Sequence, residues 1–73
     1  MTRHVYILRE EYYDHDEIVC VFGKKPSRTK LKNILTKQTG ECVDLNNVSN
    51  AINSVVYRGR YYFYELDRHE VLK

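Results

Sequence analysis

Four consecutive residues, Asp14-His15-Asp16-Glu17, combine carboxylates with an imidazole, the groups that bind metal ions and transfer protons. Adjacent residues in a turn point in different directions and rarely converge on one ion. The other two histidines, His4 and His69, lie near the chain ends and complete no second cluster. We therefore predict a solvated turn here and no metal site.

Nucleophilic catalysis needs a cysteine or serine beside a base and an orienting group. Cys20 lies inside the apolar run 18–22, where a small core residue is expected, and Cys42 has no partner in the sequence. The three glycines occur singly, at positions 23, 40 and 59, so no phosphate-cradling loop is indicated. We predict a protein that is not an enzyme and needs no cofactor.

The basic residues are concentrated in one part of the chain. Half of the 12 lysines and arginines lie in segment 24–40, which has no acidic residue, although the net charge is only +2. Such asymmetry favours an acidic or polyanionic partner, whereas a charged helix face that only keeps the protein soluble is the alternative. The basic patch consists of Lys24, Lys25, Arg28, Lys30, Lys32 and Lys37.

Aromatic residues suggest a second binding surface. The chain has seven tyrosines, two phenylalanines and no tryptophan. Residues 58–64 partly resemble the basic-glycine-aromatic strand of an RNA-recognition module, but Arg60 and Glu65 stand where aromatic residues are expected. A basic helix and strand tyrosines together keep nucleic-acid binding open as a function.

Strand alternation divides the closing aromatic run between two faces. Tyr62 and Tyr64 share one face, and Phe63 lies on the other, which we assign to the core. We expect Tyr12, Tyr62 and Tyr64 to line an exposed sheet surface and bind a protein, because tyrosine is enriched at interfaces. The alternative is a half-exposed sheet whose tyrosine hydroxyls meet only water.

Hydrophobic patterns predict the elements that would position these residues. Strands over 4–13 and 17–23 form a hairpin, and a helix over 28–39 begins after Ser27 and ends at Gly40. The spacing of apolar residues predicts a short helix at 45–53, despite four asparagines. Residues 55–57 and 60–66 read as a closing hairpin, or as one kinked strand, and 67–73 as a helical turn or tail. We predict an α+β fold, with an antiparallel sheet of three or four strands and one or two helices on one face.

Length and composition limit the function further. Seventy-three residues form one domain, 1–73, too small for a barrel or a dinucleotide-binding fold. No stretch approaches the roughly 20 apolar residues of a membrane span, and no apolar signal segment opens the chain. We expect a cytoplasmic protein with reduced cysteines and no membrane partner. A core this small leaves room for self-association to add stability.

Several segments together resemble a known group of proteins. Val5-Tyr6-Ile7-Leu8, the acidic hairpin 12–17, Phe22-Gly23, the helix after Ser27 and the run 61–67 resemble a family of short uncharacterised domains found in bacteriophages and mobile elements. The resemblance covers most of 5–39 and 61–67 and brings no known activity. It implies a phage accessory protein that binds and inhibits a host or defence protein. The alternative is a small nucleic-acid-binding protein using the basic 24–37 segment and the strand tyrosines.

Overall fold

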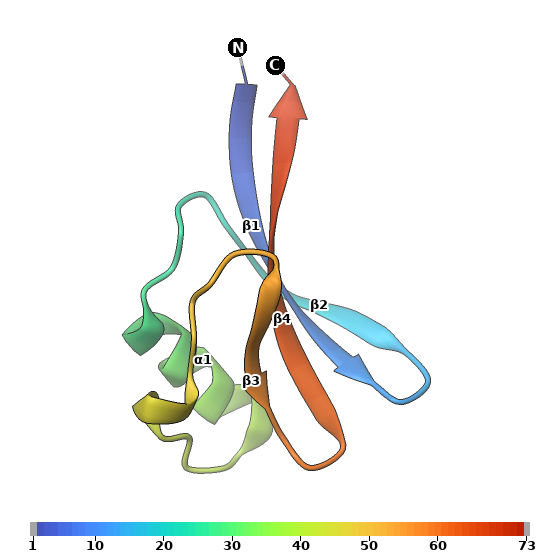
Figure 1. Ribbon diagram of the computed structural model, residues 1–73, viewed down its shortest axis with the longest axis vertical. Helices are drawn as coiled ribbons and strands as arrows, with labels where there is room; N and C mark the ends of the chain where they lie inside the picture. The colour runs from blue at the N-terminus through green and yellow to red at the C-terminus, as the bar shows by residue number, and fades with distance from the viewer. Residues whose placement is uncertain (1, 73) are drawn as a thin grey trace.

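The computed structural model describes residues 2–72, and its first half is a hairpin followed by a helix (Figure 1). The strands β1 (Thr2–Tyr12) and β2 (Asp16–Phe22) pair in antiparallel fashion, as predicted. A β-bulge interrupts the register, since Leu8 pairs with Cys20 but Arg9 pairs with Ile18. Val19 is therefore the extra residue of the bulge, and β2 pairs with β1 on both sides of it.

The helix α1 (Arg28–Thr39) has the predicted bounds and both predicted caps. The Ser27 hydroxyl accepts a hydrogen bond from the Lys30 N–H at 3.1 Å, which satisfies one of the free amides of the first turn. Gly40 adopts φ 73° and its N–H donates to the Thr36 carbonyl. A residue with a side chain is rarely stable in this left-handed conformation, so glycine ends the helix.

The segment after the helix differs from the prediction. A single turn of 3-10 helix, η1 (Leu45–Asn47), is all that forms, so the predicted helix at 45–53 is wrong beyond its first turn. Asparagine has a low helix propensity, and Asn53 takes φ 57°, a conformation that asparagine tolerates better than most residues. Val48 is nevertheless buried and Ile52 packs on the core. The helix-like spacing of the apolar residues in 45–53 therefore reflects the burial of their side chains in a loop.

The second half of the sheet is a hairpin of β3 (Ser54–Arg58) and β4 (Tyr62–Leu72), which confirms the predicted closing hairpin. β4 also pairs with the whole length of β1, and the strand order is β2-β1-β4-β3. The predicted helical turn or tail at 67–73 is wrong up to Leu72, because Asp67–Leu72 pair with Thr2–Ile7. Lys73 lies outside the described residues.

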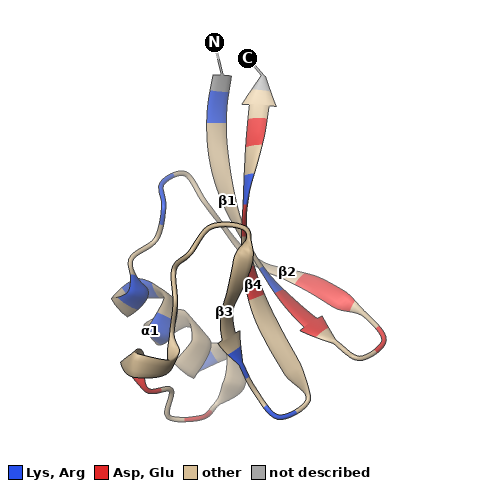
Figure 2. Cartoon of the chain, viewed as in Figure 1, with Lys and Arg blue, Asp and Glu red and all other residues tan. Residues whose placement is uncertain are grey.

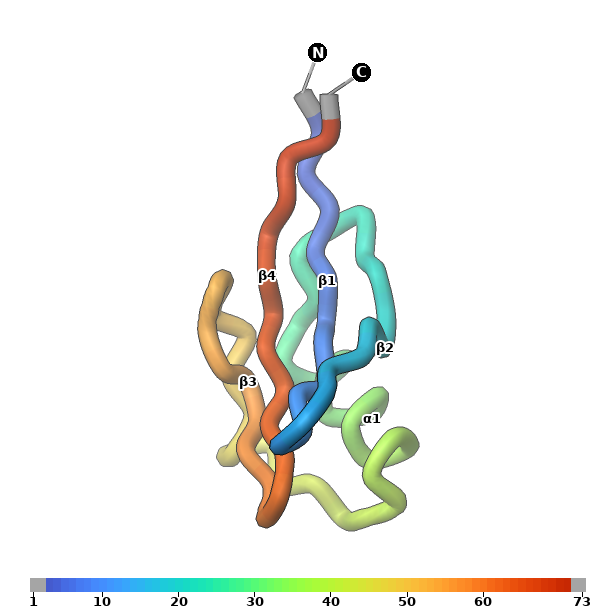
Figure 3. The backbone as a smooth tube through the Cα atoms, turned by 90° about the vertical axis from the view of Figure 1, so that its right-hand side faces the viewer, coloured from blue at the N-terminus to red at the C-terminus, as the bar shows by residue number. Residues whose placement is uncertain are grey.

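The sheet is covered on only one of its faces. Leu8 on β1 and Leu66 on β4 pair directly, and both are fully buried with Leu31 and Leu35 of α1. Figure 3, turned by 90° from Figure 1, shows β1 and β4 running along the molecule with α1 beside one side of the sheet. Residues 2–72 thus form a small α+β fold, as predicted, with a four-stranded antiparallel sheet, one α-helix and a 3-10 turn. We call the side of the sheet that faces away from α1 the open face.

Candidate functional site

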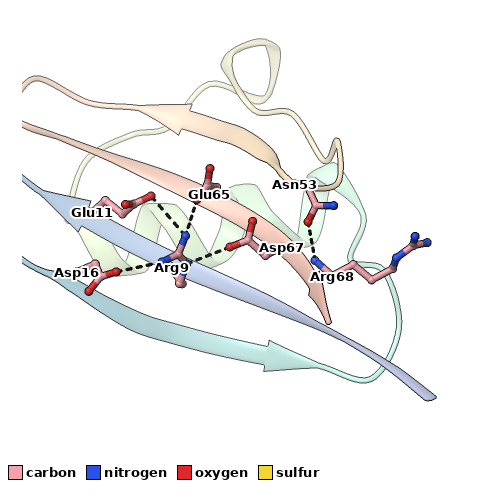
Figure 4. Close-up of polar contacts among 7 residues, drawn as sticks. All are labelled: Arg9, Glu11, Asp16, Asn53, Glu65, Asp67 and Arg68. Atoms are coloured by element: carbon pink, nitrogen blue, oxygen red, sulfur yellow. Dashed lines mark hydrogen bonds and ion pairs between the residues drawn. The ribbon is translucent and has the colours of Figure 1, made fainter. Parts of the chain in front are cut away.

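An ion-pair cluster around Arg9 occupies the centre of the open face (Figure 4). Its guanidinium donates to Asp67 at 3.0 Å, to Asp16 at 3.0 Å and to Glu65 at 2.6 Å, and lies 3.8 Å from Glu11. β1 lies between β2 and β4, so alternate residues of three strands converge on Arg9. One cation faces four carboxylates, and the cluster keeps a formal net charge of −3.

Burial and the neighbouring charges shift the pKa values of Arg9 and Glu11 in this cluster. Partial burial lowers the pKa of Arg9, but the carboxylates of Asp67, Glu11 and Glu65 outweigh it and hold that pKa above its ordinary value. Burial also raises the pKa of Glu11, and a hydrogen bond with Glu65 adds to this effect, while Arg9 opposes it. Arg9 therefore opposes the increase in the pKa of Glu11 that burial and Glu65 cause.

Aliphatic side chains extend the open face beside the Arg9 cluster. Ile18 pairs with Arg9 and Val21 pairs with Ile7, so these side chains share the face. Ile18 is 63% exposed and Val21 55% exposed, although both belong to a regular strand. A shallow hollow lies over Ile7, Arg9, Ile18 and Asp67. Exposed aliphatic groups therefore lie beside the acidic cluster on this face.

The tyrosines predicted to bind a protein lie mainly on the opposite, helix-facing side. Tyr64 is fully buried and Tyr62 is half-buried against the core, so the prediction that they line an exposed surface is wrong. Phe63, predicted to lie in the core, is on the open face with the Arg58 guanidinium 5.5 Å from its ring centroid. The signal was present in the sequence, since Phe63 alternates with the charged residues Glu65 and Asp67 while Tyr64 alternates with Leu66.

Tyr12 alone of the three predicted tyrosines is exposed, at 39%. Its ring stacks on His15 with centroids 4.8 Å apart and meets the edge of Tyr62 at 5.8 Å. The Tyr62 ring in turn meets the Tyr64 ring edge to face, with centroids 5.7 Å apart. These aromatic contacts join the end of β1 to the core, so they stabilise the sheet.

Glu10 is a buried acid within this group of tyrosines. Only 5% of it is exposed, and its carboxylate accepts a hydrogen bond from the Tyr64 hydroxyl. Burial and this hydrogen bond strongly raise the pKa of Tyr64, so the hydroxyl keeps its proton and remains a donor. A hydrogen bond to Glu10 also raises the pKa of Tyr12. This hydrogen bond gives the buried Glu10 side chain a polar partner.

The basic patch lies apart from the open face, on the loop before α1 and on α1 itself (Figure 2). Lys24, Lys25 and Lys37 are exposed, and Lys32 is half-buried. Lys30 lies 5.3 Å from the centroid of the Phe22 ring. The lysines make no ion pair with any residue between 2 and 72, so they form a solvated positive surface.

Arg28 differs from the lysines because its guanidinium is already bound. Its side chain donates to the carbonyls of Val48 and Leu45, both at 2.8 Å. Lysine has one ammonium and cannot reproduce this fork of donors. We expect Arg28→Lys to lower the free energy of unfolding by about 1 kcal/mol, measured by urea denaturation. An equal effect of Lys32→Gln, which removes no such hydrogen bonds, would contradict this role.

The remaining sequence candidates are the acidic turn with His15 and the two cysteines. The side chains of Asp14 and His15 form a hydrogen bond of 2.8 Å in an exposed turn. This hydrogen bond lowers the pKa of Asp14 and raises the pKa of His15. Among residues 2–72, no three His, Cys, Asp or Glu side chains are grouped to hold a metal ion. Cys20 is a half-buried free thiol and Cys42 an exposed one.

Comparisons with known proteins do not assign this chain to a family. No family model, curated protein or solved structure matches the chain. In the part of the chain that the structure describes, no helix has the length and apolar character needed to cross a membrane.

Proposed function

We propose that this protein is a non-enzymatic binding module whose open face contacts a basic surface of another protein. The observation that carries the proposal is the uncovered sheet face with four carboxylates around Arg9 and exposed aliphatic groups beside them. An acidic face attracts lysine- and arginine-rich surfaces, repels phosphate and repels a second copy of itself face to face. The aliphatic side chains supply apolar area for the contact.

The resemblance to phage and mobile-element domains suggests what kind of partner this is. We propose a bacterial host or defence protein, bound and inhibited through the open face. The second candidate is nucleic-acid binding, which the solvated lysines of the basic patch favour. The two surfaces lie on different elements, so substitutions can separate the two functions.

Capture experiments with paired variants test the proposal. The immobilised protein is incubated with nuclease-treated bacterial lysate, and any retained protein is purified and titrated. We expect Glu65→Gln with Asp67→Asn to weaken binding about tenfold, because the cluster loses two charges while Arg9 keeps hydrogen-bond acceptors. Lys32→Gln with Lys37→Gln changes the net charge by the same amount in the opposite direction, on the helix, and should leave the affinity unchanged.

Two outcomes would contradict the proposal. Retention that disappears after nuclease treatment would favour the nucleic-acid candidate, particularly if the helix variant also abolished it. A gain in affinity from the helix variant as large as the loss from the open-face variant would show that net charge alone governs capture. Thermal melting of each variant confirms that the fold is intact.

A further inference from the structure

The outer edge of β2 is an unpaired strand edge. The strand order places β2 at one side of the sheet, and β1 is the only strand among residues 2–72 that pairs with it. At the other side of the sheet, the Ser49 N–H donates to the Val56 carbonyl, so the loop before β3 covers part of that edge. Unpaired edges are templates for adding a further strand, and proteins protect them with bulges, with charged side chains, or with proline or lysine inside the strand. β2 has the bulge at Val19 and two acidic residues at its start, but its segment Cys20–Phe22 is regular and contains neither proline nor lysine.

Charges flank β2 in an unsymmetrical way. Asp16 and Glu17 begin the strand, and Lys24 and Lys25 follow Gly23 in the loop that leaves its other end. Figure 2 shows the acidic residues at the hairpin end of β2 and the lysines on the loop that leads to α1. Glu17, Lys24 and Lys25 are exposed and take part in none of the ion pairs of the described chain. One end of the edge is therefore negative and the other positive.

We propose that two copies of this chain associate by antiparallel pairing of β2 with β2. An antiparallel two-fold arrangement brings the acidic end of each strand beside the basic end of the other, so the same complementary contact forms twice. A parallel arrangement would place like charges together. The charge pattern therefore selects a second copy, in this one direction, as the partner of the edge.

Side-chain direction restricts the register of this pairing. Pairing of Asp16 or Glu17 with Lys24 or Lys25 of the second copy places either Cys20 or Val21 on the two-fold axis, because residues directly opposite in a two-fold antiparallel pair are equally far from that axis. The bulge at Val19 favours Val21 on the axis, because the central pairs then use only the regular residues Cys20–Phe22. Either register brings Asp16 and Glu17 near Lys24 and Lys25 of the second copy.

The dimer would join the two four-stranded sheets into one. A two-fold axis perpendicular to the sheet puts both α1 helices on one side and both open faces on the other. Self-association through β2 therefore leaves the Arg9 clusters accessible and side by side. The inference does not depend on the proposed function, since it concerns the strand edge and not the open face.

Sedimentation velocity over a wide range of concentration tests the pairing with two charge-reversed chains. We expect wild-type protein to form a dimer in a concentration-dependent way. Glu17→Lys alone, or Lys24→Glu with Lys25→Glu, should raise the dimer Kd at least about tenfold, because each substituted side chain changes from attraction to repulsion at both symmetric contacts. An equimolar mixture of the two variants should form a heterodimer, since the reversed charge at position 17 then faces the reversed charges at positions 24 and 25, and the unchanged Glu17 faces the unchanged lysines.

Matched controls make the result decisive. Lys32→Glu with Lys37→Glu changes the net charge as much as the loop variant but lies on α1, so its dimer Kd should stay within about twofold of the wild type. A wild-type protein that stays monomeric at every concentration overturns the proposal. A dimer whose Kd neither edge variant raises overturns it as well. So do two variants that each raise the Kd but form no heterodimer when mixed. Circular dichroism verifies that each variant is folded.

Discussion

Replacing Tyr64 with alanine is expected to remove most of the free energy of unfolding of this domain at room temperature. Tyr64 is the largest fully buried side chain, and truncating a buried aromatic residue costs roughly 3–5 kcal/mol. The substitution also removes the hydroxyl that donates to buried Glu10, which leaves a poorly solvated carboxylate. A domain of this length is stable by only on the order of 5–10 kcal/mol. Thermal and urea unfolding, followed by circular dichroism, measure the loss.

Two further variants separate the causes of that loss. Tyr64→Phe keeps the ring and removes only the hydroxyl, so we expect a cost of about 1–3 kcal/mol for the unsatisfied Glu10. Phe63→Ala lies on the open face beside Arg58 and should cost no more than about 1 kcal/mol. A stable Tyr64→Ala protein together with an unfolded Phe63→Ala protein would mean that the two faces of the sheet are exchanged.

The elements whose signals are local could be predicted from the sequence. The helix over 28–39 carries its own start at Ser27 and its own stop at Gly40, and both caps form as expected. Two segments had no such local signal. Asp67–Leu72 become a strand only because Thr2–Ile7 lie opposite, and the apolar residues of 45–53 are buried by packing without forming a helix. Tertiary contacts decide both segments.

The candidate site was harder to predict than the fold. Alternation places Arg9 and Glu11 on one face of β1, but Asp16, Glu65 and Asp67 join them only through the register of two strand pairs. Tyrosine composition favoured the wrong surface, since tyrosine serves a buried core as well as an interface when its hydroxyl finds a partner. Glu10 supplies that partner for Tyr64, and nothing in the local sequence marks Glu10 as buried.

Removing the cation of the Arg9 cluster is expected to destabilise the protein in a way that depends on pH. Arg9→Met keeps most of the side-chain volume but leaves Glu11, Asp16, Glu65 and Asp67 facing one another without a positive charge. The Arg9 side chain is 29% exposed, so solvent screens part of the effect. We expect a loss of roughly 1–3 kcal/mol near pH 7, between the values for surface and buried ion pairs.

The direction of the pH dependence follows from the carboxylates. Burial and neighbouring carboxylates already raise the pKa of Glu11, and Arg9 is the group that opposes this increase. Without Arg9, the folded-state pKa of Glu11 should lie further above its unfolded value of about 4. A raised carboxylate pKa contributes stability that is present below the unfolded pKa and lost as the pH rises through the folded pKa. The deficit of Arg9→Met should therefore be largest at neutral pH and shrink towards pH 4.

Urea denaturation of the wild type, Arg9→Met and Arg9→Lys between pH 4 and pH 7 measures this difference. Arg9→Lys retains the charge but not the fork of donors, so it should recover part of the stability and most of the pH independence. A deficit of equal size at every pH would mean that Arg9 acts by packing its aliphatic stem. In that case the carboxylates of the open face would be held apart by the sheet itself, and their charge would not depend on Arg9.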